Sequence, residues 1–315
     1  NRLARLDATS GAIVLSWVPG STEAGIVTFE TTPTKVLVGG TFTTIAGSTN
    51  SPRFAVLSKS DASLIGAPSV TSTVFDMEKY GDDILVGGAF TSTGFPQNRI
   101  GLTDKITGAI NQNFPGANST VNVIIEDGSG GWYLGGSFSE VGDVSVDRIV
   151  HILSDFSIDF TFSCEPNSTV ETLLLVGNDL YVGGAFTTIN GNILTRVARV
   201  NATSGAPDVS WNPSVNSTVL SIADAGTEIA IGGFFTEIDD QEEDRYFAKL
   251  SKTTDDVDPG IVANNTVSAM ESTAGSVFIG GSFTTLGFYK RGFAGFEGGS
   301  DSPIREFPVT NGTVN

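Results

Sequence analysis

The chain is poor in the residues that build most catalytic and metal centres. Its 315 residues include a single cysteine, Cys164, and a single histidine, His151. One cysteine excludes a disulfide within the chain. A zinc site or a histidine-based triad needs partners at defined spacing, and neither residue has a second copy to supply one. The sequence therefore predicts no catalytic residues and no bound cofactor.

Basic residues and long apolar runs are also scarce. Lysine and arginine number 17 against 35 aspartates and glutamates, which gives a formal net charge of −18. An acidic surface repels phosphate backbones and anionic lipids, which argues against nucleic-acid partners and membrane docking. No stretch approaches 18 apolar residues, so we expect no membrane insertion. This balance is typical of an acidic extracellular protein or a protein of a cell surface or virion.

Helical periodicity is missing as well. The apolar runs are 4 to 7 residues long, rich in Val, Ile, Phe and Tyr, and bounded by Gly, Asp, Asn and Pro. No window of 12 residues carries a sustained i, i+3, i+4 apolar stripe. Runs of this kind predict strands, so we expect an all-β chain.

What the chain does have is a repeat. The segment Gly-Gly-x-Phe occurs six times, with steps of 48, 48, 48, 49 and 48 residues between first glycines. Its members are Gly39, Gly40 and Phe42; Gly87, Gly88 and Phe90; Gly135, Gly136 and Phe138; Gly183, Gly184 and Phe186; Gly232, Gly233 and Phe235; and Gly280, Gly281 and Phe283. Four short strands in each copy of about 48 residues predict the blade of a β-propeller.

The glycine pair has a structural interpretation. Glycine weakens a strand, so two in succession need a reason, and close approach of a neighbouring blade supplies one. The phenylalanine two residues later would fill the gap between blades. The alternative is a phosphate-binding loop, but that requires a helix after the glycines. A Thr/Ser-rich loop follows instead, which favours the structural interpretation.

The copies begin and end out of phase with the chain. Residues 1–24 read as the second half of a blade, and six repeats follow at about 25–72, 73–119, 120–168, 169–217, 218–265 and 266–313. We expect residues 1–315 to form one propeller domain with an incomplete last blade, cut from a longer chain. Seven blades are favoured, six are the runner-up, and an open solenoid is third because it leaves strand edges unpaired.

Two runs carry a resemblance to a known family. They are Leu-Val-Gly-Gly-x-Phe, as in residues 85–90, and Arg-hydrophobic-Ala-x-Leu, as in residues 2–6 and 53–57. With these the chain resembles the delta-sixty repeat family of bacterial β-propellers and the propeller region of a fungal cell-surface polarity protein. The resemblance covers nearly the whole chain and implies a propeller fold in a surface or extracellular protein, but no activity.

Single residues receive structural interpretations. An arginine recurs before the third strand of each copy, and we expect it to bond carbonyls of the preceding loop or to stack on an aromatic ring. His151 is expected in a strand at a blade surface, and Cys164 is expected to pack in a blade. The recurring arginines are Arg2, Arg53, Arg99, Arg148, Arg196, Arg245 and Arg291.

Two kinds of candidate site remain. Acidic loops can bind calcium through hard oxygen ligands, although neither loop here has the spaced pattern of a calcium loop; the candidates are Asp239, Asp240, Asp255, Asp256 and Asp258. Asn-x-Ser/Thr sequons are acceptors for glycans, and the competing interpretation is that Asn and Thr simply suit the repeated turn. The sequons begin at Asn118, Asn167, Asn201, Asn216, Asn264 and Asn311.

Two functions follow from these observations. The favoured one is a non-catalytic structural or interaction module of an extracellular assembly, such as a virion or tail-fibre component, a surface filament or an adhesin. Its partners would be protein subunits or a surface glycan. The alternative is a propeller-fold glycan- or peptide-processing hydrolase that uses channel carboxylates, with Asp76, Glu78, Glu126 and Glu171 as scattered candidates.

Overall fold

The computed structural model of the chain consists of strands and loops. It describes residues 3–7, 9–10, 12–20, 25–48, 53–67, 70–81, 83–91, 98–104, 110–111, 113–239, 246–258, 261–273 and 276–288. No residue within these ranges lies in a helix, which confirms the prediction of an all-β chain. The chain divides into two compact units, Asn1–Phe160 and Thr161–Asn315, which are described separately.

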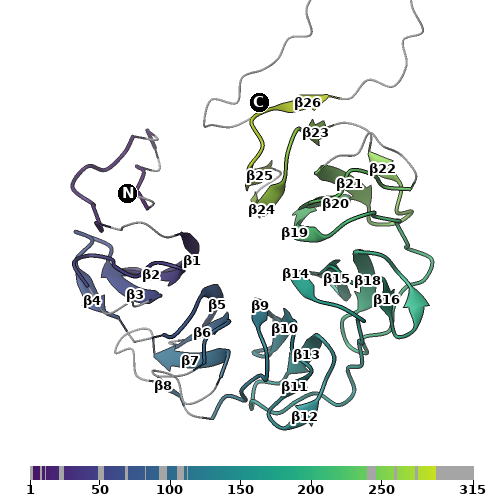
Figure 1. The fold of residues 1–315 in the computed structure, drawn as a ribbon, viewed down its shortest axis with the longest axis horizontal. Coiled ribbons are helices and arrows are strands. Elements are labelled where there is room, and N and C mark those ends of the chain that lie inside the picture. The colour runs from purple at the N-terminus through teal and green to yellow at the C-terminus, as the bar shows by residue number, and fades with distance from the viewer. Residues whose placement is uncertain are drawn as a thin grey trace, which may run out of the picture. The chain divides into compact units, whose positions relative to one another are not determined.

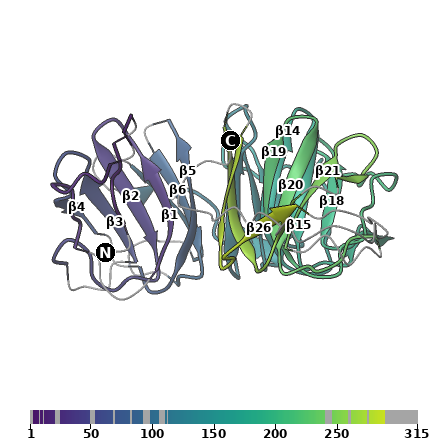
Figure 2. The same ribbon diagram turned by 90° about the horizontal axis from the view of Figure 1, so that it is seen from above.

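The first unit contains three repeat sheets, called blades 1 to 3 (Figures 1 and 2). Blade 1 consists of β1 (Ile26–Thr31), β2 (Lys35–Gly40), β3 (Phe54–Ser58) and β4 (Leu64–Gly66). Blade 2 consists of β5 (Val74–Tyr80), β6 (Asp83–Gly88), β7 (Ile100–Asp104) and β8 (Ile110–Asn111). Blade 3 consists of β9 (Val121–Glu126), β10 (Trp132–Gly136) and β13 (Ile149–Ile152), with a small hairpin of β11 (Glu140–Val141) and β12 (Val144–Ser145).

The second unit repeats this plan in blades 4 to 6. Blade 4 consists of β14 (Val170–Val176), β15 (Asp179–Gly184) and β18 (Val197–Asn201), with a hairpin of β16 (Thr188–Ile189) and β17 (Asn192–Ile193). Blade 5 consists of β19 (Val219–Ala225), β20 (Glu228–Gly233), β21 (Phe247–Ser251) and β22 (Val257–Asp258). Blade 6 contains β24 (Val267–Thr273) and β25 (Ser276–Gly281), and β23 (Ile261–Ala263) pairs with β26 (Leu286–Phe288).

Within each blade the strands are antiparallel and follow chain order. The first strand shifts register by one residue opposite the glycine pair, as where β5 pairs Val74 with Gly88 and Asp76 with Gly87. The same bulge recurs in blades 1, 3, 4, 5 and 6. A bulge sharpens the local twist of a strand. The repeated sequence therefore specifies a repeated backbone irregularity as well as a repeated sheet.

The core of each unit lies between consecutive blades. Phe90 of blade 2 is buried with Leu37, Phe54 and Val56 of blade 1. Phe138 of blade 3 is buried with residues of blade 2, and Phe235 of blade 5 with residues of blade 4. The phenylalanine of the motif thus packs its own blade against the preceding one.

The two glycines of each pair face different neighbours. A Cβ atom added to Gly87 would lie 2.9 Å from side-chain atoms of both Val121 and Ile124 in blade 3. A Cβ added to Gly88 would lie 2.2 Å from the carbonyl oxygen of Thr73, just before the first strand of its own blade. Contacts under 3.0 Å are too short for real carbon atoms, so both positions require glycine. The first glycine admits the next blade, and the second admits the backbone of its own blade.

Candidate functional site

The recurring arginine donates hydrogen bonds to the loop that follows the glycine pair of its own blade. In Arg148 the guanidinium Nη1 donates to the carbonyl oxygens of Ser137, at 2.9 Å, and Phe138, at 3.1 Å. Its backbone N–H donates to the oxygen of Phe138, and its own carbonyl accepts from the N–H of Gly136. In the other blades that show the contact, the guanidinium donates to the residue after the glycine pair: Arg53 to Thr41, Arg99 to Ala89 and Arg196 to Ala185.

These arginines adopt an uncommon backbone conformation. Their φ angles are 51° for Arg53, 68° for Arg99, 63° for Arg148 and 69° for Arg196. A side-chain-bearing residue is rare at positive φ and stays there only where its surroundings fix it. The bonds to the glycine loop provide that constraint. The arginine thus bonds carbonyls of the preceding loop, which is one of the two roles considered from the sequence.

Blade 5 departs from this pattern. There the residue with positive φ is Tyr246, at 62°, and its backbone makes the same bonds with Phe235 and Gly233. The residue of blade 5 that is equivalent to the other arginines is therefore Tyr246, one residue after Arg245. Arg2, Arg245 and Arg291 lie outside the described residues.

Four of the sequon asparagines make one recurring contact. Asn167 Nδ2 donates to the hydroxyl of Thr187 at 2.8 Å, and its Oδ1 accepts from the backbone N–H of Thr187 at 2.8 Å. Asn118 binds Ser139, Asn216 binds Thr236 and Asn264 binds Thr284 in the same reciprocal way. In blade 2 Thr71 takes the place of the asparagine: its hydroxyl donates to the carbonyl oxygen of Thr91 and accepts from the backbone N–H of Thr91. We call this contact the loop clip.

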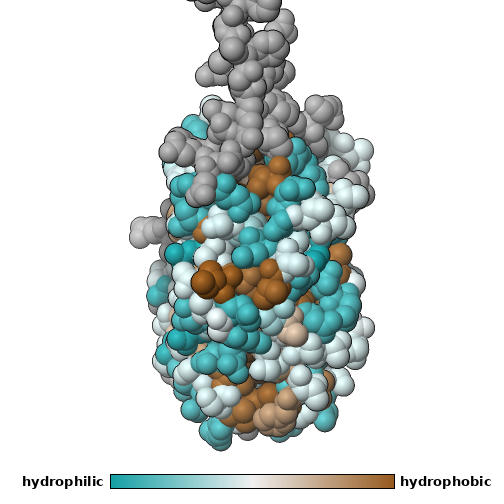
Figure 3. Space-filling view, turned by 90° about the vertical axis from the view of Figure 1, so that its right-hand side faces the viewer, coloured by the Kyte–Doolittle hydropathy of each residue, from teal (hydrophilic) through white to brown (hydrophobic). Residues whose placement is uncertain are grey.

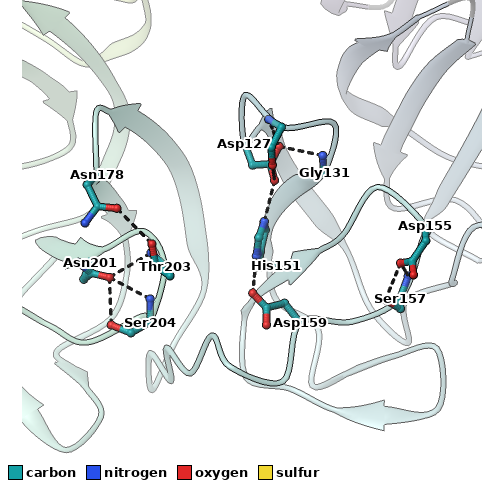
Figure 4. Close-up of polar contacts among 11 residues, drawn as sticks. Asp127, Gly131, His151, Asp155, Ser157, Asp159, Asn178, Asn201, Thr203 and Ser204 are labelled. Carbon is teal, nitrogen blue, oxygen red and sulfur yellow. Dashed lines mark hydrogen bonds and ion pairs between the residues drawn. The ribbon is translucent and has the colours of Figure 1, made fainter.

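Asn201 has a different environment from the clip residues. Its Oδ1 accepts from the N–H groups of Thr203 and Ser204 and from the Ser204 hydroxyl, which closes the turn after β18 (Figure 4). In the loop clip, each asparagine Nδ2 already donates to a Ser or Thr hydroxyl. This bond gives a structural reason why the asparagine recurs at one place in the repeat. The remaining sequon, at Asn311, lies outside the described residues.

His151 lies in strand β13, as expected, but the expectation that it faces the surface is wrong. The residue is 8% exposed and lies between two carboxylates (Figure 4). Its Nδ1 is 2.9 Å from Asp159 Oδ2, its Nε2 is 3.1 Å from Asp127 Oδ2, and its ring stacks on Tyr133 with centroids 4.4 Å apart. Both nitrogens must carry hydrogen for both contacts to be hydrogen bonds.

The charges around this histidine are fixed by hydrogen bonds. Burial alone would raise the pKa of Asp127, but bonds from Ser129, Gly131 and His151 hold that pKa at about 2. Burial and the nearby Asp127 and Asp159 carboxylates raise the pKa of Tyr133 to about 12. Asp127 also closes the turn between β9 and β10 by accepting from the N–H groups of Ser129 and Gly131. The cluster is a buried structural network.

Blades 4 and 5 each have an equivalent pair, in which a basic side chain on the third strand contacts an aspartate that follows it in the chain. Arg199 of β18 forms an ion pair with Asp208, and Lys249 of β21 lies 3.0 Å from Asp258. The cation stands three residues after the positive-φ residue in each case, as His151 stands three residues after Arg148. Sequence reasoning missed this pairing, and the cation at this fixed offset was the signal that could have revealed it.

Carboxylates gather on the first strands of blades 1 to 3. Asp76 Oδ2 accepts from the N–H of Ile124 in blade 3 at 2.7 Å, and its Oδ1 accepts from the N–H of Met77 at 2.9 Å. Burial, aided by the negative charges of Glu78 and Glu30, raises the pKa of Asp76 to about 7, although the two hydrogen bonds by themselves would lower it. The other copies carry an uncharged residue opposite the same glycine: Thr28, Val123, Thr172, Ser221 or Ala269.

The second acid of β5, Glu78, also has a raised pKa. Burial, together with the negative charges of Glu126 and Glu30, raises the pKa of Glu78 to about 7. Lys79 reaches across to Glu30, with 2.5 Å between Nζ and Oε2. In the second unit, burial raises the pKa of Glu171. Strands β1, β5 and β9 are neighbours, so the structure brings the carboxylates of the first unit onto adjacent strands.

The calcium candidates are engaged in separate contacts. Asp239 accepts from the N–H of Ser214, Asp255 from the N–H of Asn212, and Asp258 from Lys249. Asp256 accepts from Thr254, and Asp240 lies outside the described residues. Within the described ranges, no group of three or more His, Cys, Asp or Glu side chains is arranged to hold a metal ion. Cys164 is buried, and burial raises the pKa of its thiol.

Comparisons with known proteins agree with this architecture. A family described as a β-propeller domain of unknown function, DUF5122, matches residues 178–210. The extracellular domain of a protein described as the one component system BT4673 of B. thetaiotaomicron is 13% identical, with a TM-score of 0.54 over 88% of this chain. This chain covers 33% of that longer chain.

A second structure is more distant. The WD40 β-propeller domain of Doa1 is 14% identical with a TM-score of 0.44, over 84% of this chain and 92% of its own. No curated protein sequence matches. The family match and the likeness to the B. thetaiotaomicron domain concern fold alone. The chain has a β-propeller fold. No helix among the described residues is long and apolar enough to cross a membrane.

Proposed function

We propose that the chain is a non-catalytic interaction module of an extracellular assembly, on a cell surface or virion, whose partners are protein subunits or a glycan. The observation that carries the proposal is the loop clip. In blades 3 to 6 it fixes the loop after the glycine motif in one geometry, with exposed Ser, Thr and Asn side chains around it. A repeated rigid polar loop loses little conformational entropy when it binds a partner.

The surface is compatible with such a role. Figure 3 shows a face on which hydrophilic and intermediate residues predominate and hydrophobic residues form separate small groups. The structural neighbour from B. thetaiotaomicron is an extracellular domain by its description. The acidic charge and polar loops support the same extracellular location. We also propose that the repeats are of the delta-sixty type.

We further propose seven blades. The support comes from residues 3–20, which contact blade 1 as the outer half of blade 4 contacts blade 5. Trp17 Nε1 donates to the Ser58 carbonyl at 3.0 Å, as Trp211 Nε1 donates to that of Ser251 at 2.8 Å. Arg5 donates to the Lys59 carbonyl, as Arg199 donates to that of Lys252. These matching contacts support the assignment of this N-terminal segment to the outer strands of a further blade.

The experiment is a binding screen with matched clip variants. The purified chain is applied to a glycan array, and the mass of each bound glycan is then measured by mass spectrometry to detect cleavage. Asn167→Ala combined with Asn216→Ala should weaken binding about tenfold, because it frees two loops, whereas Asn201→Ala should not. Binding without cleavage supports the module. Equal binding by all three proteins would show that the clipped loops are not the binding surface.

The hydrolase alternative retains one specific observation in its favour. Asp76 and Glu78 lie two residues apart on β5, and both have a pKa raised to about 7, which is common for acid–base catalysts. The same screen decides between the functions. Cleaved glycans whose release stops in Glu78→Gln would establish the hydrolase and overturn the non-catalytic proposal.

A further inference from the structure

Blade 5 carries an exposed aromatic residue directly after its glycine pair, where strand β20 ends (Figure 1). This residue, Phe234, is 52% exposed, whereas the phenylalanine of the motif beside it, Phe235, is fully buried. A single apolar side chain on a surface is ordinary, so the surroundings of Phe234 decide whether it has a role. The other copies have small residues at this position, namely Thr41, Ala89, Ser137, Ala185 and Ser282.

The accessibility of this position is a property of the blade. In blades 3 and 4 the loop that follows the motif is described throughout, and Ser137 and Ala185 are only half-buried there. In blade 5 the first strand, β19, contacts the first strands of blades 4 and 6, so the blade already has a neighbour on each side. The ring of Phe234 therefore stays open to solvent although its blade is packed on both sides.

A second exchange in blade 5 leaves a backbone acceptor free beside this ring. In blades 1 to 4 the guanidinium of the recurring arginine donates to the carbonyl oxygen of the residue after the glycine pair. In blade 5 Tyr246 stands in place of the arginine and has no guanidinium to donate. Among the described residues, none donates a hydrogen bond to the carbonyl oxygen of Phe234. The two exchanges together place an unused acceptor next to an exposed aromatic ring.

Hydroxyl groups lie on one side of Phe234. Its backbone N–H donates to the carbonyl oxygen of Thr218 at 2.9 Å, which sets Phe234 beside the segment of Ser217 and Thr218. In blade 3 the equivalent side chains, those of Ser119 and Ser137, approach each other to 3.3 Å between their hydroxyl oxygens. Both Ser217 and Thr218 are half-buried, so their hydroxyls are within reach of a molecule that lies on the Phe234 ring.

The rest of the loop limits the kind of ligand that fits. Thr236 is held to Asn216 by the loop clip, with 3.1 Å between the Thr236 hydroxyl and Asn216 Nδ2. The loop is therefore fixed before a ligand arrives, and binding loses little conformational entropy. The acids Glu237 and Asp239 follow in the same loop, which disfavours anionic ligands. A neutral ligand with one apolar face and several hydroxyl groups matches these features.

We propose that this loop of blade 5, residues 216–218 and 234–236, binds a neutral pyranose sugar. A pyranose ring has an apolar face of C–H bonds and a rim of hydroxyl groups. The C–H face stacks on the negative face of the Phe234 ring, and a sugar hydroxyl donates to the Phe234 carbonyl oxygen. Ser217 and Thr218 supply the few further polar contacts that orient a small ligand. This site depends on the proposed role as an interaction module and gives that role a ligand class.

The test measures the binding of short oligosaccharides by isothermal titration calorimetry. The neutral probes are cellohexaose, maltohexaose and N-acetylchitohexaose, and hexagalacturonic acid is the anionic counterpart. Wild type should bind at least one neutral probe and should bind hexagalacturonic acid about tenfold more weakly or not at all.

Variants of Phe234 locate the site. Phe234→Ser should weaken binding of the neutral probe about tenfold or more, because the stacking surface is lost, and Phe234→Tyr should retain it. Serine occupies this position in blades 3 and 6, so Phe234→Ser should keep the wild-type circular dichroism spectrum and melting temperature. Phe160→Ser, the matched control at another exposed phenylalanine, should bind like wild type.

A third variant tests the free acceptor. Tyr246→Arg restores the guanidinium that binds the equivalent carbonyl oxygen in blades 1 to 4, so it should weaken binding about threefold or more with Phe234 unchanged. Four results would each overturn the site: no neutral probe bound, wild-type affinity in Phe234→Ser, wild-type affinity in Tyr246→Arg, or an equal loss in Phe160→Ser. Array binding that depends on the loop clip but not on Phe234 would overturn this site and leave the proposed module intact.

Discussion

Gly87 and Gly280 occupy the same position of the same motif, and their surroundings differ completely. Gly87 is enclosed by Val121 and Ile124 of blade 3, while Gly280 faces open space. Their own blades hold them in the same way, because the second glycine of each pair lies against the carbonyl before the first strand, that of Thr73 or Thr266. The comparison separates two uses of the motif: one is local to the blade, and the other depends on a neighbour.

The largest expected difference concerns the side chains that cover the glycine. Ile124→Ala should lower the free energy of unfolding by about 3 kcal/mol, because a buried side chain between blades is removed. Phe29→Ala, at the equivalent position of β1, should change it by no more than about 0.5 kcal/mol in the monomer. Denaturant unfolding of both variants measures the difference. Similar losses for the two would mean that the β1 face is covered in solution.

The glycines themselves give the next largest effect. Gly87→Ala should destabilise by about 2 kcal/mol, because its Cβ would overlap Val121 and Ile124. Gly280→Ala should be within about 0.5 kcal/mol of wild type, since its Cβ meets open space. The midpoints of urea unfolding measure both. A tolerated Gly87→Ala would contradict the close approach of blades 2 and 3.

Asp76 adds a pH dependence to the covered interface. Its pKa is raised to about 7 from 3.8, so the folded state binds the proton more tightly than the unfolded state. The stabilisation is fully present below pH 4 and is lost as the pH rises through about 7. The stability of Asp76→Asn relative to wild type should therefore increase by roughly 1 kcal/mol between pH 6 and pH 8. A difference that does not vary with pH would show that Asp76 does not titrate in this window.

The loop clip should give the smallest effect, and the same one in both regions. Asn167→Ala in blade 4 and Asn264→Ala in blade 6 each remove a hydrogen bond of 2.8 Å to a threonine hydroxyl at an exposed site. Each should cost about 1 kcal/mol or less. Thermal unfolding of the pair measures this. A clearly larger loss at Asn167 would show that the clip depends on the neighbouring blade.

Several features of the fold were predictable because they are local. Short apolar runs bounded by turn residues fixed the strands, and the spacing of Gly-Gly-x-Phe fixed where each second strand ends, as at Gly88 and Gly184. The arginine before the third strand was predictable as a carbonyl ligand because it recurs at one offset. Its positive φ was not predictable, since the loop bonds that impose it appear only in the folded backbone.

The candidate site was much less predictable. His151 was expected at a surface, but it is buried because Asp127 and Asp159, 24 residues before it and 8 residues after it, come together around it. Burial raises the pKa of Asp76, and one of its hydrogen bonds crosses to Ile124 of the next blade, 48 residues away. Sequence patterns do not state which face of a strand a neighbour covers.

By itself, the sequence determined the repeating unit: strand lengths, turns and the glycine pair follow from the preferences of neighbouring residues along the chain. Only the tertiary structure decided which copies of that unit are covered and which are open. Phe29 and Ile124 have the same local position, and they differ because a glycine strand lies against one and not the other. Burial is a property of the neighbours that pack in space, and identical local sequence cannot encode it.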